Sequence, residues 1–111
     1  MNFWESLSKP FFALAPMADV TDAAFRRIIA KYGKPDVTWT EFVSADGLCH
    51  PLGKAKLMKD LEYSEAERPI VAQLFSSNLE NMQAACKLCA ELGFDGIDIN
   101  MGCPADDIVK Q

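Results

Sequence analysis

The stretch PIVAQLFSSNLENMQAACKLCAELGFDGIDINMGCP, residues 69–104, decides the fold class. Ile70 to Phe75 is an apolar run with the length of a strand. Phe94 to Asn100 is predicted as a strand whose residues alternate, with Ile97 and Ile99 on one face and Asp98 and Asn100 on the other. Between these two strands, Asn78 is placed to cap a helix and Gly93 to end it. Because a strand, a helix and a strand follow one another with short connections, we predict a right-handed βαβ unit in a parallel sheet.

The same alternation extends toward the N-terminus. Phe11 to Ala15 and Val37 to Val43 are apolar or β-branched runs that indicate two further strands. Between these strands, Thr21 is placed to cap an amphipathic helix that Gly33 closes. The apolar residues of this helix recur at helical spacing: Phe25, Ile28, Ile29 and Tyr32. Another helix is predicted over Lys54 to Leu61.

Two α/β architectures fit this pattern of parallel strands with intervening helices. Length favours a doubly wound sheet, since a TIM (β/α)8 barrel needs eight strands and roughly 250 residues. The barrel is nevertheless preferred, because no Gly-rich phosphate loop follows the first strand and polar residues end successive strands. These residues are Glu41, Gln73 and Asn100, which in a barrel line one mouth. We therefore predict that residues 1–111 form one unit, the N-terminal half of a TIM barrel with about four parallel strands.

Composition and charge limit the function classes. With 50% hydrophobic and 24% charged residues, the chain is typical of a globular domain. It shows no signal peptide and no apolar run long enough to span a membrane, so we expect a cytoplasmic location. The net charge of −5 argues against a nucleic-acid surface on this segment by itself. Cys86 and Cys89 have the spacing of a redox pair but lie late in a helix, which favours core packing and free thiols.

Cys103 directly follows the last predicted strand, between Gly102 and Pro104, so its thiol is expected over the carboxyl-terminal face of the sheet. A cysteine there could be a nucleophile, a metal ligand, a general acid or a packing residue. The nucleophile and metal roles are disfavoured, because the only histidine, His50, lies in an irregular segment and no Cys or His has ligand spacing with Cys103. An ordinary thiol is protonated at neutral pH and can deliver a proton to carbon. A general acid and a packing thiol remain as interpretations.

Gln73 and Asn100 are carboxamides late in otherwise apolar strands, where an unpaired polar group costs free energy. A side chain of a neighbouring strand would satisfy them. The polar edge of a planar heterocycle would also do so, because a carboxamide offers a donor and an acceptor together. Asp98 and Glu41 are polar as well, and they can pair structurally in a barrel interior.

Three separated segments resemble the tRNA-dihydrouridine synthases. They are APMADVTDAAFR at residues 15–26, PIVAQL at residues 69–74 and DINMGCP at residues 98–104. The order and spacing of the segments agree with that family, and the resemblance extends from about Pro10 to the last residue. It implies an FMN-binding TIM barrel followed by a small helical domain. The implied reaction is NADPH-dependent reduction of the uridine C5–C6 double bond in tRNA, which yields 5,6-dihydrouridine.

The resemblance implies a role for each matched residue. Gln73 would hydrogen-bond the edge of the isoalloxazine ring, and Asn100 would lie near both the flavin and the target base. Cys103 would protonate C5 while reduced FMN delivers hydride to C6, which agrees with the general-acid interpretation. Residues at the end of the first strand would contact the flavin: Pro16, Met17 and Ala18.

The chain departs from the family pattern at a few positions. Asp19 stands where the family commonly has Gly, and Ser76 and Ser77 replace a Gly-containing turn. Asp106 and Asp107 occupy positions where basic residues are frequent. These differences bear on the subfamily and the position of the substrate more than on the chemistry.

Two rival functions remain. One is another FMN barrel that acts on a free pyrimidine, similar to a dihydroorotate dehydrogenase. The other is an inactive barrel fragment that acts as an interaction module. Half a barrel would have an unpaired sheet edge and lack phosphate-binding loops, so the 111 residues alone are expected to be inactive. We expect tRNA to bind mainly through segments outside this chain, and we predict no metal site and no particular oligomeric state.

Overall fold

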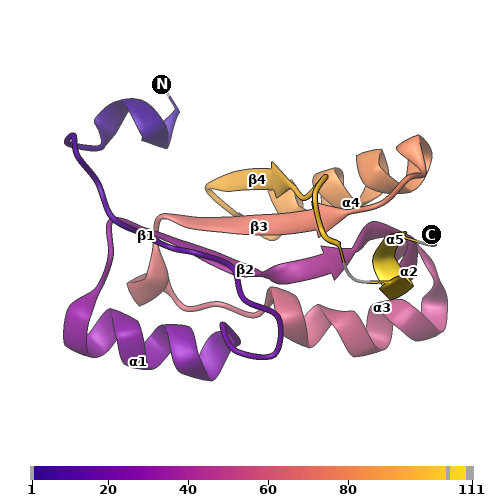
Figure 1. The fold of residues 1–111 in the computed structure, drawn as a ribbon, viewed down its shortest axis with the longest axis horizontal. Helices are drawn as coiled ribbons and strands as arrows, with labels where there is room; N and C mark the ends of the chain where they lie inside the picture. Colours follow the sequence, from indigo (N-terminus) through magenta and orange to yellow (C-terminus); the bar gives the residue numbers. More distant parts are fainter. Residues whose placement is uncertain (1, 105, 110–111) are drawn as a thin grey trace.

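Within the part of the chain that the structure describes, four parallel strands form one sheet in the order β1-β2-β3-β4 (Figure 1). The computed structural model describes residues 2–104 and 106–109. The rest of the predicted unit lies outside the described residues: Met1, Ala105, Lys110 and Gln111. The strands are β1 (Ala13–Leu14), β2 (Val37–Ser44), β3 (Ile70–Phe75) and β4 (Gly96–Ile99).

The strand order confirms the predicted fold class. A doubly wound sheet reverses its strand order at a switch point, whereas here every connection moves the chain one strand further in the same direction. Right-handed crossovers of this kind place the helices on one face of the sheet. The other face corresponds to the interior of a barrel. Phe3, in the short turn η1 (Phe3–Ser6), lies against Gly96 at the amino-terminal end of that face.

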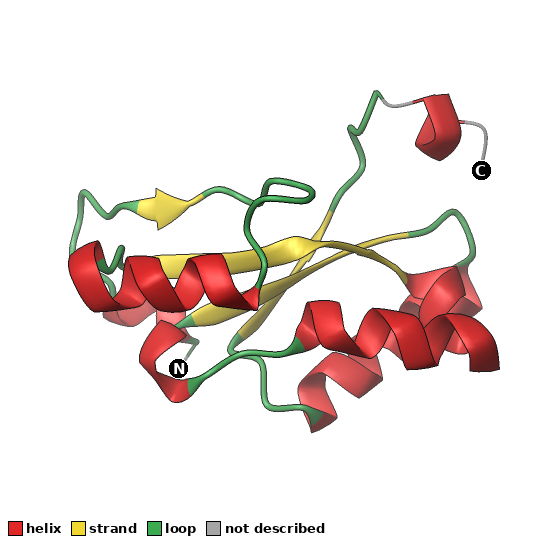
Figure 2. Cartoon of the chain, turned by 90° about the horizontal axis from the view of Figure 1, so that it is seen from below, coloured by secondary structure: helices red, strands yellow, loops and turns green. Residues whose placement is uncertain are grey.

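The α-helices of the described residues are α1 (Ala23–Gly33), α2 (Ala45–Cys49), α3 (Pro51–Leu57), α4 (Leu79–Glu91) and α5 (Asp106–Val109). Two further 3-10 turns are η2 (Met58–Leu61) and η3 (Glu65–Glu67). Figure 2 shows that α5 stands apart from α2, although the two overlap in Figure 1. None of the helices in the described ranges combines the length and the apolar character that a membrane span requires.

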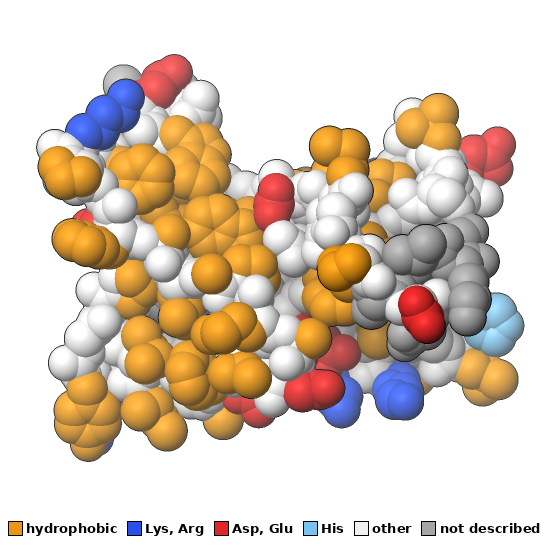
Figure 3. Space-filling view, viewed as in Figure 1, with side chains coloured by type: hydrophobic (Ala, Val, Ile, Leu, Met, Phe, Trp, Pro, Cys, Tyr) orange, Lys and Arg blue, Asp and Glu red, His pale blue; other side chains and the backbone are white. Residues whose placement is uncertain are grey.

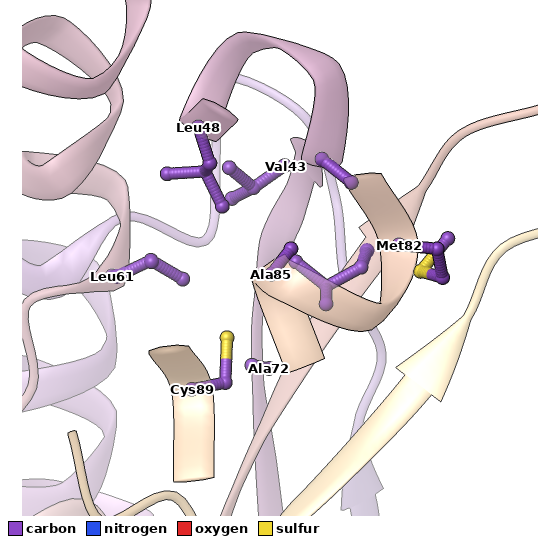
Figure 4. Packing of buried hydrophobic residues seen from close by; sticks show 9 residues of the cluster. Val43, Leu48, Leu61, Ala72, Met82, Ala85 and Cys89 are labelled. Carbon is purple, nitrogen blue, oxygen red and sulfur yellow. The ribbon is translucent and has the colours of Figure 1, made fainter. Parts of the chain in front are cut away.

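The hydrophobic core lies between the sheet and the helices. Every residue of β3 is buried, because this strand is central and covered on both faces. The core side chains come from β2, β3, α2, α4 and η2 (Figure 4): Val43, Leu48, Leu61, Ala72, Met82, Ala85 and Cys89. Burial of a Val, Leu or Met side chain contributes about 1.5–3 kcal/mol. This cluster is therefore a major source of cohesion between the sheet and its helices.

The predicted ends of α4 are confirmed, whereas the predicted cap of α1 is wrong. The Asn78 side chain accepts from the backbone N–H of Asn81 at 3.0 Å, and Gly93 follows α4 with φ +84°. In α1 the capping residue is Asp22, not Thr21, and its Oδ1 accepts from the N–H of Phe25 at 2.8 Å. The Thr21 hydroxyl is instead buried and bonded to the backbone of the loop that follows β1.

The predicted apolar stripe of α1 is only partly buried, since Phe25 and Ile29 are half-buried. Ile28 and Tyr32 are 59% and 78% exposed, while Arg26 is wholly buried. Figure 3 shows hydrophobic side chains gathered on the half of the molecule that holds η1, β1 and α1. The physical reason lies in the partner of Arg26: Glu67 of η3 presents a buried carboxylate, so α1 turns its Arg26 face toward it.

Residues 45–61 depart from the predicted single helix over Lys54 to Leu61. The chain forms α2, then α3, and then the turn η2. Two glycines of this segment, Gly47 and Gly53, permit close contact between α2 and α3. A Cβ at Gly53 would lie 2.4 Å from the carbonyl oxygen of Gly47, so only glycine fits there.

The outer strands are shorter than predicted. β1 begins at Ala13 because Phe12 is bonded to the loop that precedes β2: its N–H donates to Asp36 Oδ2 at 2.8 Å, and its carbonyl accepts from the Asp36 N–H at 2.9 Å. β4 keeps the predicted alternation. Ile97 and Ile99 point to one face, and Asp98 points to the opposite face together with its register partner Gln73.

Candidate active site

The polar side chains of β3 and β4 are hydrogen-bonded to one another. Gln73 and Asp98 are partners in the strand register, and Gln73 Nε2 donates to Asp98 Oδ2 at 2.6 Å. On the other side of the same carboxamide, Asn100 Nδ2 donates to Gln73 Oε1 at 3.4 Å. The neighbouring-strand interpretation of these two amides is therefore realised in the structure, and Asp98 takes the structural pairing that was considered for it.

The Cys103 loop, residues 100–104, continues from these side chains. The backbone N–H of Gly102 donates to Asn100 Oδ1 at 3.0 Å, which fixes the loop just before Cys103. Cys103 is half-buried and its thiol is free. It lines a pocket of about 260 Å³ whose other walls include Phe75, Asn100 and Met101. The pocket lies where the carboxyl ends of β3 and β4 meet the Cys103 loop, so Cys103 is at the end of the sheet where it was expected.

The end of β1 lies elsewhere in the described fold. Pro16, Met17 and Ala18 follow β1, where the carbonyl of Met17 accepts from the N–H groups of Val20 and Thr21 at 3.1 and 3.0 Å. Met17 is 41% exposed. β1 and β4 form opposite edges of the sheet, and none of the three residues lines the Cys103 pocket. The structure thus links Gln73, Asn100 and the Cys103 loop directly, but not the residues that follow β1.

Glu41 does not join the polar cluster, which corrects the prediction that it lines the same mouth as Gln73 and Asn100. A register irregularity between Trp39 and Phe42 gives Phe42, not Glu41, the position opposite Gln73. Glu41 Oε2 instead accepts from the backbone N–H of Asp19 at 2.6 Å. Asp19 has φ +59°, the left-handed conformation for which glycine is best suited and which Asp tolerates.

A second hydrogen-bonded group that the sequence did not reveal supports one wall of the pocket. Ser76, which lines the pocket at the end of β3, donates through Oγ to Asp46 Oδ2 at 2.8 Å. Asn81 Nδ2 donates to the other oxygen of the same carboxylate at 2.6 Å. Asp46 therefore ties the β3–α4 connection to α2. Because α2 was not predicted, no sequence signal placed Asp46 near Ser76.

Cys86 and Cys89 take part in the packing of the core, as their position late in the helix predicted. Cys89 is wholly buried in the core, and this desolvation, together with the nearby Cys86, raises the pKa of its thiol to about 11. A thiol of this kind is a poor nucleophile because the thiolate is disfavoured. No group of three or more His, Cys, Asp or Glu side chains suited to a metal ion occurs among the residues described.

Comparison with known protein families identifies the family of this chain. A model of the family described as dihydrouridine synthase matches residues 13–111, which include both the Gln73 and the Cys103 segments. The chain belongs to the dihydrouridine synthase family. Membership also agrees with the strand order, since the first four strands of a TIM barrel follow one another in sequence.

Curated relatives of this family member come from several bacteria. "Probable tRNA-dihydrouridine synthase 2" of Bacillus subtilis strain 168 is 48% identical over 107 residues, covering 96% of this chain and 33% of the relative. "Probable tRNA-dihydrouridine synthase" of Staphylococcus aureus strain COL is 43% identical over 110 residues, covering 99% and 34%. A relative of the same name in Staphylococcus epidermidis is 42% identical over 110 residues. The chain spans about a third of the length of these relatives.

Proposed function

We propose that this chain is the N-terminal part of an FMN-dependent tRNA-dihydrouridine synthase, an oxidoreductase that uses NADPH to reduce uridine in tRNA to 5,6-dihydrouridine. Family membership supports the reaction class. One observation carries the site: Asn100 and Cys103 share a pocket at the carboxyl ends of β3 and β4, and Asn100 is bonded to Gln73. Ligand sites of parallel α/β sheets lie at this end.

Residues in and beside the pocket are proposed to hold the edge of a flavin ring. Gln73 does not itself line the pocket but is hydrogen-bonded to Asn100, which does. Gln73 retains one N–H and one lone pair after its bonds to Asp98 and Asn100, so it can still donate and accept. Phe75 and Met101 add apolar surface for the ring. A further flavin contact is proposed from the residues after β1: Pro16, Met17 and Ala18. None of the described residues that line the pocket is basic, so the FMN phosphate would be bound elsewhere in the protein.

Cys103 is proposed as the general acid. Reduced FMN, when bound, supplies the hydride that goes to C6 of uridine. The S–H of Cys103 donates its proton to C5, so the C5–C6 π bond is replaced by one new C–H bond at each carbon, and the thiolate regains a proton from solvent. The bond from Gly102 N–H to Asn100 Oδ1 fixes the start of the Cys103 loop. The partial burial of Cys103 keeps the thiol at the pocket rather than in bulk water.

Asn100 is proposed to bind the target base as well as to face the flavin. Its Nδ2 and Oδ1 are each engaged in one hydrogen bond, to Gln73 and Gly102. A carboxamide has two N–H groups and two lone pairs, so one donor and one acceptor remain. Uracil presents the complementary N3–H and C4 carbonyl. Asn100 therefore has the hydrogen-bonding capacity to orient the uracil ring beside Cys103.

The tRNA backbone is proposed to bind mainly outside this chain. Phosphate recognition needs clustered Lys and Arg side chains, whereas this chain has a net charge of −5. The relatives are about three times as long as the matched region, so most of such a protein would lie outside this chain. We propose that the whole protein acts on tRNA in the cytoplasm and that these 111 residues alone are inactive.

The test uses the purified full-length protein that contains this chain. Visible flavin absorbance and release of FMN on denaturation establish the cofactor, and dihydrouridine is measured in unmodified tRNA after incubation with NADPH. The proposal expects bound FMN and turnover of tRNA, with no turnover of free orotate or uracil. FMN with turnover of a free pyrimidine alone would favour the dihydroorotate-type rival. Absence of flavin would favour an interaction module.

A further inference from the structure

Asp98 is the charged end of a hydrogen-bond network that leads to Gly102, the residue before Cys103. Its Oδ2 accepts from Gln73 Nε2 at 2.6 Å. Gln73 Oε1 in turn accepts from Asn100 Nδ2 at 3.4 Å, and Asn100 Oδ1 accepts from Gly102 N–H at 3.0 Å. The hydrogen-bond network thus passes from β4 to β3 and returns to Gly102, the residue that precedes Cys103.

The Asp98 carboxylate fixes the donor and the acceptor of every hydrogen bond in this network. A carboxylate accepts hydrogen bonds and cannot donate them, so the NH₂ group of Gln73 must face Asp98 and its carbonyl must face Asn100. The same constraint passes to Asn100, whose NH₂ group faces Gln73 and whose carbonyl faces the Gly102 N–H. A side chain at position 98 that both donates and accepts would allow the Gln73 carboxamide to flip, so that its oxygen and its nitrogen exchange places.

The surroundings of Asp98 show that the carboxylate serves the amide rather than an ion pair. Among the described residues, the ion pairs involve Glu65, Glu67 and Asp95, and none involves Asp98. Gln73 is only 8% exposed and Asp98 is half-buried, so the bond between them is partly buried. Hydrogen bonds to a charged group are shorter and roughly twice as strong as neutral ones, and the bond from Gln73 is of this kind because its acceptor is a carboxylate.

We propose that Asp98 is a positioning residue of the flavin site. It sets the Gln73 carboxamide in one orientation, so that the remaining N–H and lone pair of Gln73 meet the ring edge in a fixed order. Through Asn100 it also sets the start of the Cys103 loop. This inference rests on the proposed function, since it requires that Gln73 faces FMN.

The test measures FMN binding by full-length holoprotein after reversible removal of the flavin. Asp98→Asn keeps the shape of the side chain but allows it to donate as well as accept. We expect roughly a tenfold rise in the FMN dissociation constant, in line with the loss of one charge-assisted hydrogen bond, and an altered flavin absorption spectrum. In a Gln73→Leu background, the same Asp98→Asn change should alter the dissociation constant less than about twofold, because coupled residues are non-additive.

Asp95→Asn is the matched control. Asp95 precedes the same strand, at its other end, and bonds to Arg68 Nη1 at 2.9 Å and to the Ile70 N–H at 2.8 Å. This variant should lower the melting temperature and leave the FMN dissociation constant unchanged. An Asp98→Asn variant that binds FMN like the wild type would overturn the inference. So would an equal loss of affinity with and without Gln73. A wild-type protein that binds no FMN would be a separate result, visible before any variant is made, and would overturn the proposed function with it.

Discussion

Arg26 and Glu67 form a fully buried ion pair in which Arg26 Nε donates to Glu67 Oε1 at 2.8 Å. The pair joins α1 to η3, two elements that lie far apart in the sequence. The other two nitrogens of Arg26 and the second carboxylate oxygen of Glu67 are also hydrogen-bonded. Arg26 Nη1 donates to the Thr21 carbonyl at 2.7 Å, and the Ser64 hydroxyl donates to Glu67 Oε2 at 2.7 Å. A buried pair with this many hydrogen bonds holds α1 against η3, the turn that precedes β3.

Replacement of Glu67 by Gln should destabilise the protein strongly. The change leaves the Arg26 charge buried without a counter-charge, and loss of one partner of a buried pair costs about 3–5 kcal/mol. Urea denaturation of the full-length protein measures the free energy of unfolding. Glu65→Gln is the control, because the Glu65 side chain is 81% exposed and its pair with Arg68 should contribute less than about 1 kcal/mol. Equal stability of the two variants would contradict the structural role given to Glu67.

Position 19 should accept Gly and reject a β-branched residue. Asp19 has φ +59° and its backbone N–H is bonded to Glu41, so any replacement must keep the left-handed conformation. Asp19→Gly should change stability by less than about 1 kcal/mol, since its easier backbone geometry offsets its greater chain entropy. Asp19→Val should cost roughly 1–2 kcal/mol. Melting temperatures of the two variants give the comparison. If Val were tolerated as well as Gly, the left-handed assignment at this position would be wrong.

Stability should fall with rising pH through the Cys89 thiol. Burial raises the pKa of this thiol in the folded protein to about 11, while its ordinary value is 9.0. Between about pH 9 and about pH 11, the Cys89 thiol loses its proton in the unfolded chain and keeps it in the folded protein. The contribution of this thiol to the free energy of unfolding is therefore complete below about pH 9 and is lost as the pH approaches about 11. We expect Cys89→Ser to weaken this decline in the free energy of unfolding. Cys49→Ser, at an exposed thiol, should leave the decline unchanged. The same decline in both variants would argue against a buried Cys89 thiol.

The central βαβ unit could be predicted from the sequence because its signals are local. β3 matches the predicted run Ile70 to Phe75, and the Asn78 cap and the Gly93 end of α4 occur where expected. Some failures are local, such as the Thr21 cap and the unpredicted helix α2, but the buried face of α1 was missed because its partner is distant in the sequence. The helical period of α1 marked Ile28 and Tyr32 as the packed face, but the carboxylate of Glu67, 41 residues after Arg26, decides which face is buried.

In the candidate site, too, features set by local sequence could be predicted, whereas pairings between distant residues could not. Alternation along β4 was sufficient to place Asp98 opposite Ile97 and Ile99, and the loop position of Cys103 was sufficient to place it at the carboxyl end of the sheet. The pairing of Gln73 with Asp98 depends on the register between strands 25 residues apart, which no local pattern gives. Glu41 was misplaced for a related reason, because an irregularity in β2 shifts the residues after Trp39 by one position.

The proposal that Cys103 is the general acid is tested most directly by single-turnover reduction of tRNA with the full-length Cys103→Ala protein. The enzyme is first reduced with NADPH and then mixed with unmodified tRNA, and dihydrouridine formation and flavin reoxidation are followed together. We expect Cys103→Ala to retain FMN and to form dihydrouridine at least about 100-fold more slowly, the usual cost of losing a general acid. Cys49→Ala, at an exposed thiol outside the pocket, should react like the wild type. Dihydrouridine formation by Cys103→Ala at the wild-type rate would contradict the assignment of the proton donor.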